Sequence, residues 1–309
     1  MERVNLKMLY EKALKNKYAL GAFNFVNMES AQAIALAAKE TNSPVILACS
    51  EGAIKYMGLP FVINTAKAVK EVAKVPVVLH LDHGSSYEIC KTVIDAGFDS
   101  VMIDASHLPL NENIETTKKV VDYAKGLGVA VEGELGRLSG IEDYINVSKA
   151  QSFYTDPFEA KVFVEKTGVT SLAIAIGTSH GAFKFNGDAK LEFNVLKKIE
   201  ELLPNTPLVL HGASSIEPED VKLINDFGGK MEGAKGVNAE ILKKVSSMHN
   251  ICKINVDSDL RIAFTGMVRK TLQENPKIFD IRKILLPSNE LMQKRIKERI
   301  ECFGSKDKA

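Results

Sequence analysis

Short apolar runs bounded by turn residues recur along the chain, and most of them are separated by segments with the apolar spacing of amphipathic helices. The run at 44–50 is apolar almost throughout, which is typical of parallel strands covered on both faces. Helical spacing is clearest at 28–40, 60–73, 87–96 and 114–127. The pattern predicts strands at 22–25, 44–50, 75–81, 100–105, 129–135, 171–176, 207–210 and 251–256.

Eight strand-and-helix units predict an α/β protein with a closed (β/α)8 TIM barrel, followed by a C-terminal helical extension at 281–303. An open, doubly wound sheet is the alternative, but its first strand normally leads into a glycine-rich turn, and 23–27 is not one. No linker or repeat divides the chain, so we expect a single domain over residues 1–309. The longest irregular connection, 139–156, is a candidate active-site lid.

Composition narrows the function classes. The 309 residues are 45% hydrophobic and 26% charged, with a net charge of +1 that offers no general attraction to nucleic acid or to an anionic membrane. No apolar run reaches membrane-spanning length, and residues 1–10 lack the apolar core of a secretory signal. Four scattered cysteines fit free thiols. We expect a cytoplasmic protein that binds a small molecule, with no nucleic acid and no membrane partner.

Three of the six histidines stand at predicted strand ends, each before a glycine: His83, His180 and His211. Barrel enzymes carry their reacting groups at the carboxyl ends of the strands, so these imidazoles should meet at one mouth. Three such ligands suit zinc and leave its fourth position open for water or substrate. A single histidine of this kind would as readily be a hydrogen-bonded structural residue. Their repetition at equivalent positions favours a metal.

Carboxylates accompany these histidines. Asp82 adjoins His83, and both can face the mouth only if the strand ends there, because neighbouring strand residues point to opposite faces. A carboxylate beside a metal is a natural general acid or base, although Asp82 could also cap a helix or support a ligand. Glu132 and Glu134 share one strand face, where burial requires a cation or hydrogen bonds. Asp104 could join them or make an ordinary buried hydrogen bond.

Two further segments, 211–215 and 255–261, follow the seventh and eighth predicted strands, where barrels commonly bind phosphate. Both are rich in small hydrogen-bond donors, which hold phosphate without net positive charge. Gly181 and Lys184 offer a third set of donors, and Arg261 could bind a second phosphate. Each feature could instead be a turn, a cap or a surface ion pair.

Six segments, in order, resemble the zinc-dependent class II fructose-bisphosphate aldolases. They are 22–24 with 28–29, then 81–84, 132–134, 177–181, 211–214 and 255–259, and the likeness runs from about 22 to 261. The resemblance implies a lyase that reversibly cleaves fructose 1,6-bisphosphate to dihydroxyacetone phosphate and glyceraldehyde 3-phosphate, in glycolysis or gluconeogenesis.

The resemblance also implies roles for the metal and proton-transfer residues. The catalytic Zn²⁺ would be held by His83, His180 and His211, with Asp104 and Glu134 as ligands of a more buried metal position. Asp82 would exchange a proton with the C4 hydroxyl, and Glu142, on the candidate lid, would shuttle the other proton. Glu132 would support the ligands from behind.

The phosphosugar contacts that the resemblance implies are Ser50, Gly181, Lys184, Gly212, Ser214, Asn255, Asp257, Ser258, Asp259 and Arg261. It further implies a monovalent cation, Na⁺ or K⁺, near the backbone of Gly181 and Ser214, and assembly into a homodimer or homotetramer.

Several alternatives stay open. Tagatose 1,6-bisphosphate differs from the fructose sugar at C4, and the acidic run from Asp257 to Arg261 favours fructose. A zinc-dependent barrel hydrolase and a catalytically silent phosphosugar-binding protein are the alternatives from other functional classes. A Schiff-base aldolase would need a reactive lysine. Lys253 lies near the start of the eighth predicted strand, away from the catalytic face, and we interpret it as structural.

Overall fold

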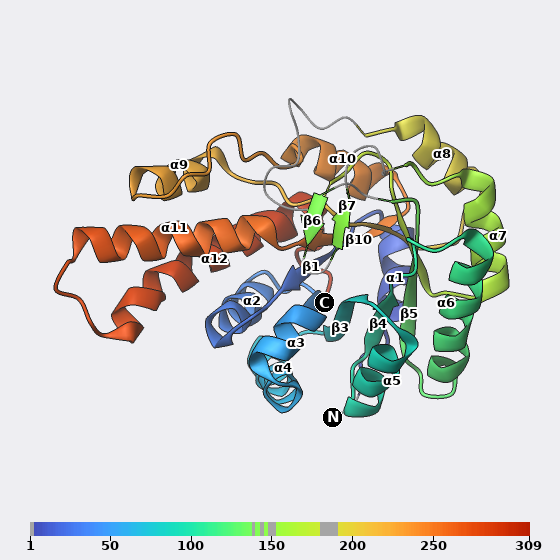
Figure 1. Ribbon diagram of the computed structural model, residues 1–309, viewed down its shortest axis with the longest axis horizontal. Helices are drawn as coiled ribbons and strands as arrows, with labels where there is room; N and C mark the ends of the chain where they lie inside the picture. Colours follow the sequence, from blue (N-terminus) through green and yellow to red (C-terminus); the bar gives the residue numbers. More distant parts are fainter. Residues whose placement is uncertain (1–2, 138–139, 143–144, 148–152, 180–190) are drawn as a thin grey trace.

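A computed structural model describes residues 3–137, 140–142, 145–147, 153–179 and 191–309, with the backbone alone at 140–142 and 145–147 (Figure 1). Within these residues, parallel strands close into a barrel in the order β1-β10-β9-β8-β5-β4-β3-β2. The closed barrel confirms the predicted fold and excludes the open sheet. The barrel strands are β1 (Leu20–Asn24), β2 (Val45–Ser50), β3 (Val77–Gly84), β4 (Ser100–Ile103), β5 (Ala130–Leu135), β8 (Ser171–Ile174), β9 (Leu208–Leu210) and β10 (Ile251–Val256).

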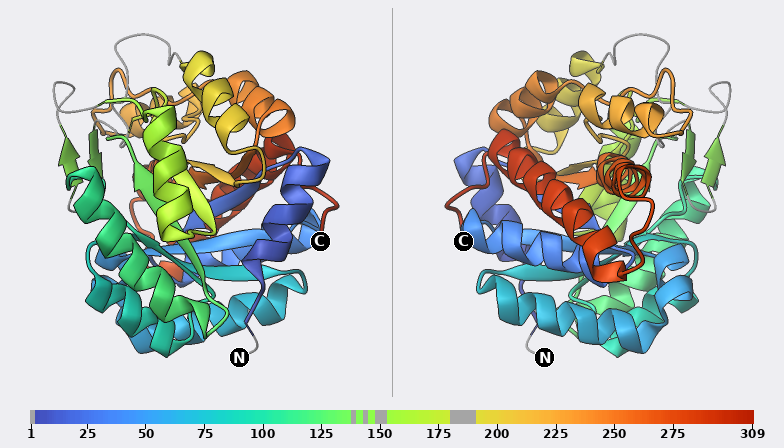
Figure 2. Two further views of the ribbon diagram at one scale, coloured as in Figure 1. Left: turned by 90° about the vertical axis from the view of Figure 1, so that its right-hand side faces the viewer. Right: turned by 90° about the vertical axis from the view of Figure 1, so that its left-hand side faces the viewer.

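Helices surround the barrel, as both side views show (Figure 2). They are α1 (Leu6–Asn16), α2 (Met28–Glu40), α3 (Glu51–Met57), α4 (Leu59–Ala73), α5 (Tyr87–Ala96), α6 (Leu110–Lys125), α7 (Pro157–Thr167), α8 (Phe193–Leu202), α9 (Pro218–Asp226), α10 (Ala239–Met248), α11 (Ser258–Glu274) and α12 (Ile281–Phe303). The antiparallel pair β6 (Gly140–Glu142) and β7 (Ile145–Val147) lies in the candidate lid, of which residues 139, 143–144 and 148–152 are outside the described residues.

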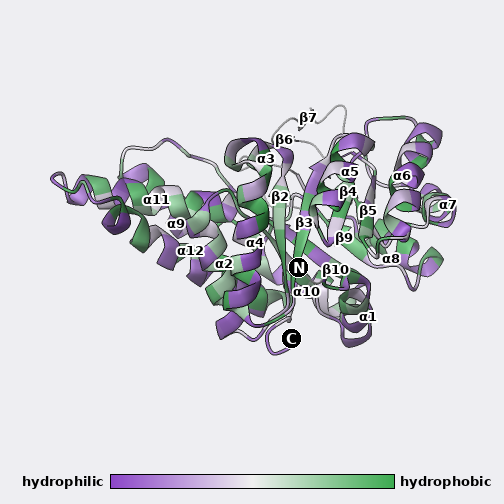
Figure 3. Ribbon diagram, turned by 90° about the horizontal axis from the view of Figure 1, so that it is seen from below, coloured by the Kyte–Doolittle hydropathy of each residue, from purple (hydrophilic) through white to green (hydrophobic). Residues whose placement is uncertain are grey.

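The main apolar core lies between the barrel wall and the helices. Strand residues such as Leu47 and Leu79 are fully buried there against helix residues such as Ile34. Figure 3 shows the pattern behind this packing: β2 is largely hydrophobic, whereas the helices carry both hydrophobic and hydrophilic residues. The amphipathic helices therefore cover the strands, as the apolar spacing predicts.

Helix α1 closes the amino-terminal end of the barrel. Leu6, Leu9 and Tyr10 pack in one buried cluster with strand residues that include Ile46 and Val78. The sequence pattern did not predict this helix, because its charged residues interrupt the apolar ones. Apolar side chains therefore close this end of the barrel.

Two long helices complete the fold. α11 and α12 pack against each other, and α12 also packs against α2; Figure 1 shows α11 and α12 extending to one side of the barrel. α12 has the bounds predicted for the C-terminal extension. In the part of the chain that the structure describes, no helix has the length and apolar character needed to cross a membrane.

Candidate active site

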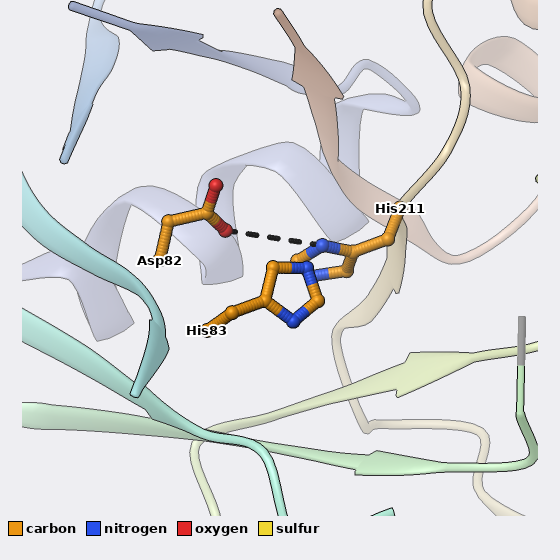
Figure 4. A group of neighbouring side chains, drawn as sticks. All are labelled: Asp82, His83 and His211. Atoms are coloured by element: carbon orange, nitrogen blue, oxygen red, sulfur yellow. Dashed lines mark ion pairs between the residues drawn. The ribbon is translucent and has the colours of Figure 1, made fainter. Parts of the chain in front are cut away.

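Asp82, His83 and His211 meet at the carboxyl end of the barrel (Figure 4). Asp82 and His83 come from the end of β3, and His211 follows β9 directly. Their potential ligand atoms all lie within 4.8 Å of one another, and the two imidazole rings are 4.6 Å apart between centroids. The His211 Nδ1 to Asp82 Oδ1 distance is 3.9 Å.

A local irregularity in β3 lets both Asp82 and His83 reach this mouth. The strand continues to Gly84, so it does not end at His83 as the sequence suggested. Instead, the register with β4 shifts between Leu81 and Gly84, and His83 adopts a left-handed backbone with φ of 49°. Such a backbone conformation is strained for a non-glycine residue, by about 1–3 kcal/mol, and is typical of functional sites. The shift breaks the alternation that would otherwise send one side chain outward.

A second group of ligand atoms adjoins the first and shares His83. Its Nδ1 lies 2.9 Å from Asp104 Oδ2 and 3.9 Å from Glu134 Oε2. Burial raises the pKa of Asp104, but the hydrogen bonds with His83 and Ser106 outweigh it and leave this pKa well below its usual value. Asp104 therefore stays charged, as a metal-supporting carboxylate must be.

Glu132 holds His211 from inside the barrel. Its Oε1 lies 2.7 Å from His211 Nε2, and both side chains are almost completely buried. Because Nε2 is engaged with Glu132, Nδ1 is the His211 nitrogen that faces Asp82 and His83. Burial, followed by the charge of His83, lowers the pKa of His211, so its ring is neutral and able to ligate a metal. A carboxylate behind a ligating histidine is a recurrent device for fixing the ring.

Lys253 completes this buried network. It is fully buried in β10, and its Nζ donates to both carboxylate oxygens of Glu132, at 3.0 and 2.9 Å, and contacts His80 Nε2 at 3.0 Å. Burial is the largest influence and raises the pKa of Glu132, but Lys253 and then His211 together outweigh it and leave this pKa below its usual value. An amine bound in this way to a carboxylate is a poor nucleophile, which supports the structural interpretation of Lys253 over a Schiff-base role.

Two asparagines orient Asp82. Asn24 Nδ2 donates to Asp82 Oδ2 at 2.8 Å, and Asn255 Nδ2 donates to Oδ1 at 2.9 Å. Asn255 is a predicted substrate contact, but Asn24 is missing from the predicted site residues. Its position at the end of β1, the edge where the other site residues stand, is the signal that could have identified it. Asp82 itself is 1% exposed, so these bonds fix its carboxylate firmly.

The loops after β9 and β10 lie side by side. The Asp257 amide donates to Ser214 Oγ at 3.2 Å, which places the start of α11 against the 212–215 loop. Gly212 has a φ of 60°, and a Cβ there would lie 2.7 Å from the Ser179 carbonyl oxygen, so only glycine fits. Hydroxyls and amides beside a helix N-terminus form a surface suited to an anion.

Two predicted substrate contacts, Arg261 and Asp259, differ in their exposure and in their partners. Arg261 Nε donates to Asp257 Oδ1 at 2.7 Å, and Arg261 also lines a hollow of about 390 Å³ with Asn27 and Tyr56. Asp259 is 1% exposed, and Arg299 donates to its carboxylate at 3.1 Å. The contact of Asp259 with the substrate stays a prediction, and in this structure its carboxylate faces Arg299.

Some of the predicted site lies outside the described residues. His180, Gly181 and Lys184 belong to this part, and only the backbone of Glu142 is described, in β6. Ser50 ends β2, where its hydroxyl accepts a hydrogen bond from the Ala53 amide and caps α3. Ser258 is the first residue of α11. The structure thus brings together predicted residues from β3, β4, β5, β9 and β10.

The barrel and its ligand cluster define a metal-dependent α/β-barrel enzyme. Two imidazoles and adjoining carboxylates form a donor set that fits zinc or a similar divalent ion. The chain belongs to the family described as fructose-bisphosphate aldolase class-II, a family of lyases whose model matches residues 4–308.

Individual relatives agree over almost the whole length. A fructose-bisphosphate aldolase of Helicobacter pylori strain J99 is 50% identical over 299 residues, which cover 96% of each chain. The fructose-bisphosphate aldolase of Thermus caldophilus is 48% identical, covering 97% of this chain and 98% of the relative. Among solved structures, the YdjI aldolase of Escherichia coli K12 superposes with a TM-score of 0.80 at 31% identity, over 100% of both chains.

Proposed function

We propose that this protein is a zinc-dependent fructose-1,6-bisphosphate aldolase. The observation that carries the proposal is the placement of Asp82, held by two asparagines, within 4.8 Å of the imidazole ligand atoms of His83 and His211. A general acid or base beside a metal is what an aldol cleavage at neutral pH requires. The relatives named fructose-bisphosphate aldolase support the same activity.

His83 and His211, with His180, would hold the metal, and the bound zinc would act as a Lewis acid on the C2 carbonyl of the sugar. Asp104 and Glu134 would supply the alternative, more buried position beside His83. In this account, the pairing of His211 with Glu132 fixes the ring before the metal arrives, so little reorganisation is needed at the site.

Asp82 would remove the proton from the C4 hydroxyl during cleavage. The C3–C4 bond then breaks, the C4 hydroxyl becomes the aldehyde of glyceraldehyde 3-phosphate, and the electron pair stays on the C3 side. That carbon must gain a proton to become dihydroxyacetone phosphate, and Glu142 is the proposed donor. In the reverse direction Asp82 would return its proton to the aldehyde oxygen.

The triose phosphate would bind where the 212–215 loop meets the start of α11. Ser214, Ser258 and neighbouring amides offer donors at a helix N-terminus, which stabilise an anion without net charge. Ser50, Gly181, Lys184, Gly212 and Asn255 stay predicted contacts. The second phosphate would lie near Arg261, whose hollow of about 390 Å³ opens beside the mouth. The proposed Na⁺ or K⁺ near Gly181 and Ser214 rests on the family resemblance.

We also propose that the chain assembles with copies of itself, as the resemblance implies. The structure supports this with an apolar hollow of about 600 Å³ between α2, α4 and α12. Among the residues that line it, Met28 is 59% exposed, Phe61 is 71% exposed and Leu286 is 59% exposed. An apolar hollow with exposed side chains of this size is typical of an interface.

The direct test is to follow triose phosphate formation from fructose 1,6-bisphosphate by the zinc-loaded protein, after chelation and after zinc is restored. We expect activity that is lost to the chelator and recovered with zinc. Release of inorganic phosphate without triose phosphate would favour a hydrolase, and binding without turnover would favour a silent binding protein. Faster cleavage of tagatose 1,6-bisphosphate would replace the proposed sugar by its C4 epimer.

A further inference from the structure

The C-terminal helix α12 carries two buried arginines one turn apart, Arg295 at 4% and Arg299 at 2% exposure. Arg295 donates to both carboxylate oxygens of Asp220, on α9, at 2.7 and 2.8 Å. Both guanidinium groups are therefore buried and ion-paired, but their partners differ. Arg295 joins α12 to a neighbouring helix, whereas Arg299 reaches the loops at the mouth of the barrel.

Arg299 contacts both loops that form the proposed phosphate site. Its Nη2 donates to the Ser215 carbonyl oxygen at 2.6 Å and to Glu217 Oε1 at 2.5 Å, and its Nε donates to Asp259 Oδ2 at 3.1 Å. Ser215 follows Ser214, and Asp259 follows Ser258. One planar side chain thus joins the residues next in sequence to both proposed phosphate-binding hydroxyls.

Arg299 stays positively charged in this position. Burial opposes it, but Asp259 and then Glu217 outweigh burial and raise the pKa of Arg299 above its usual value. Its planar fork also holds the two donating nitrogens, Nε and Nη2, at a fixed angle, which a lysine could not reproduce.

The segment before α10 also contacts the loop after β9. The Val237 amide donates to the Ser214 carbonyl oxygen at 3.0 Å, and Gly236 lies so close that a Cβ there would be 2.3 Å from that oxygen. Together with the bond from the Asp257 amide to Ser214 Oγ, these contacts fix the loop against the start of α11. Arg299 ties both loops to α12.

We infer that Arg299 is a positioning residue for the triose phosphate site: it sets the separation of the 212–215 loop and the start of α11 without touching the substrate. This inference rests on the proposed function, because it assigns the phosphate of the triose to that junction. A purely structural ion pair would stabilise the fold but leave phosphate affinity unchanged. Arg295, equally buried on the same helix, serves as the matched control.

The experiment compares the wild type with Arg299→Met, Arg299→Lys, Arg295→Met and Arg295→Lys, all as the full zinc-loaded chain. Calorimetry measures the Kd for inorganic phosphate, cleavage assays give KM and kcat for fructose 1,6-bisphosphate, and thermal melts report the fold. We expect Arg299→Met to raise both the phosphate Kd and the KM about tenfold, the size of effect of one lost hydrogen bond to a charged group, with kcat within about threefold. Arg299→Lys keeps the charge and should fall between wild type and Arg299→Met.

The Arg295 variants should lower the melting temperature while leaving phosphate Kd and KM within about twofold of the wild type. Equal changes in the Arg295 and Arg299 series, or none in the Arg299 series, would overturn the inference. If Arg299→Met does not fold, Arg299→Lys and Asp259→Asn give the same readouts from either side of the ion pair. A wild type that binds phosphate but does not cleave the sugar would instead refute the proposed function, while the phosphate Kd values would still decide the role of Arg299.

Discussion

Removing the charge of Lys253 should destabilise the protein strongly, because it leaves Glu132 as an incompletely paired charge inside the barrel. Lys253 is fully buried and gives two hydrogen bonds to Glu132, at 3.0 and 2.9 Å. Breaking a buried ion pair from one side typically costs about 3–5 kcal/mol, a large share of the roughly 5–15 kcal/mol that stabilises a domain. We therefore expect Lys253→Met to lose about 3–5 kcal/mol of unfolding free energy.

The neutral double variant separates this charge effect from packing. In Lys253→Met/Glu132→Gln no net charge is left between the two positions, so its loss should be smaller than the sum of the two single losses, by at least about 2 kcal/mol. Urea unfolding followed by circular dichroism gives these values, in the presence of a chelator so that metal binding does not contribute. Lys118→Met is the control, since Lys118 and Asp122 form a pair that is about half exposed and should change stability little.

Two results would refute this reasoning. One is a Lys253→Met variant that is no less stable than Lys118→Met, which would show that Glu132 needs no charged partner. The other is a double variant whose loss equals the sum of the single losses, which would show that the two side chains act independently.

Three further predictions follow from the same structure. Asn24→Ala removes one of the two amides that hold Asp82, so kcat for the cleavage should fall about tenfold with little change in KM, and an unchanged kcat would contradict the positioning role. Burial and then the Lys253 charge lower the pKa of His80 to about 3. As the pH falls below about 6.5, His80 therefore takes up a proton in the unfolded chain but not in the folded protein. The unfolding free energy should therefore decline by up to about 1.4 kcal/mol per pH unit below pH 6.5 from this group, and His80→Gln should flatten that slope; an equal slope in urea titrations at pH 5–7 would count against it. Phe61→Asp should reduce the molar mass measured by light scattering toward that of one chain, and unchanged mass would remove the hollow between α2, α4 and α12 as the contact surface.

Periodicity predicted the barrel because each strand is covered by helices on one side and by the barrel interior on the other. That environment leaves a local signature, a short apolar run followed by an amphipathic helix, as at 44–50 and 60–73. The same logic failed at α1, whose buried residues Leu6, Leu9 and Tyr10 face the barrel end among many charges. A helix that closes a barrel end occurs once in the chain, so a repeated pattern does not predict it.

The position of candidate site residues could be predicted where residue type coincides with a strand end, as for Asp82 and His83. Contacts between distant segments could not be predicted in this way. The bond from Asn24 to Asp82 and the enclosure of Asp259 by Arg299 both join segments far apart in the chain. The bulge at His83 was missed for a different reason: a left-handed histidine has no sequence signal, and an ending strand would present the same two residues.

The most direct test of the account is to separate the metal from the proton transfer with one substitution. Asp82→Asn keeps the shape and the neighbouring histidines, so the variant should still bind about one zinc per chain, as measured by elemental analysis. We predict that its cleavage of fructose 1,6-bisphosphate falls by at least about a hundredfold, the usual effect of removing a general acid or base. Exchange of the hydroxymethyl hydrogen of dihydroxyacetone phosphate with solvent should persist. Cleavage at the wild-type rate by the zinc-loaded variant would contradict the role of Asp82 and with it the proposed mechanism.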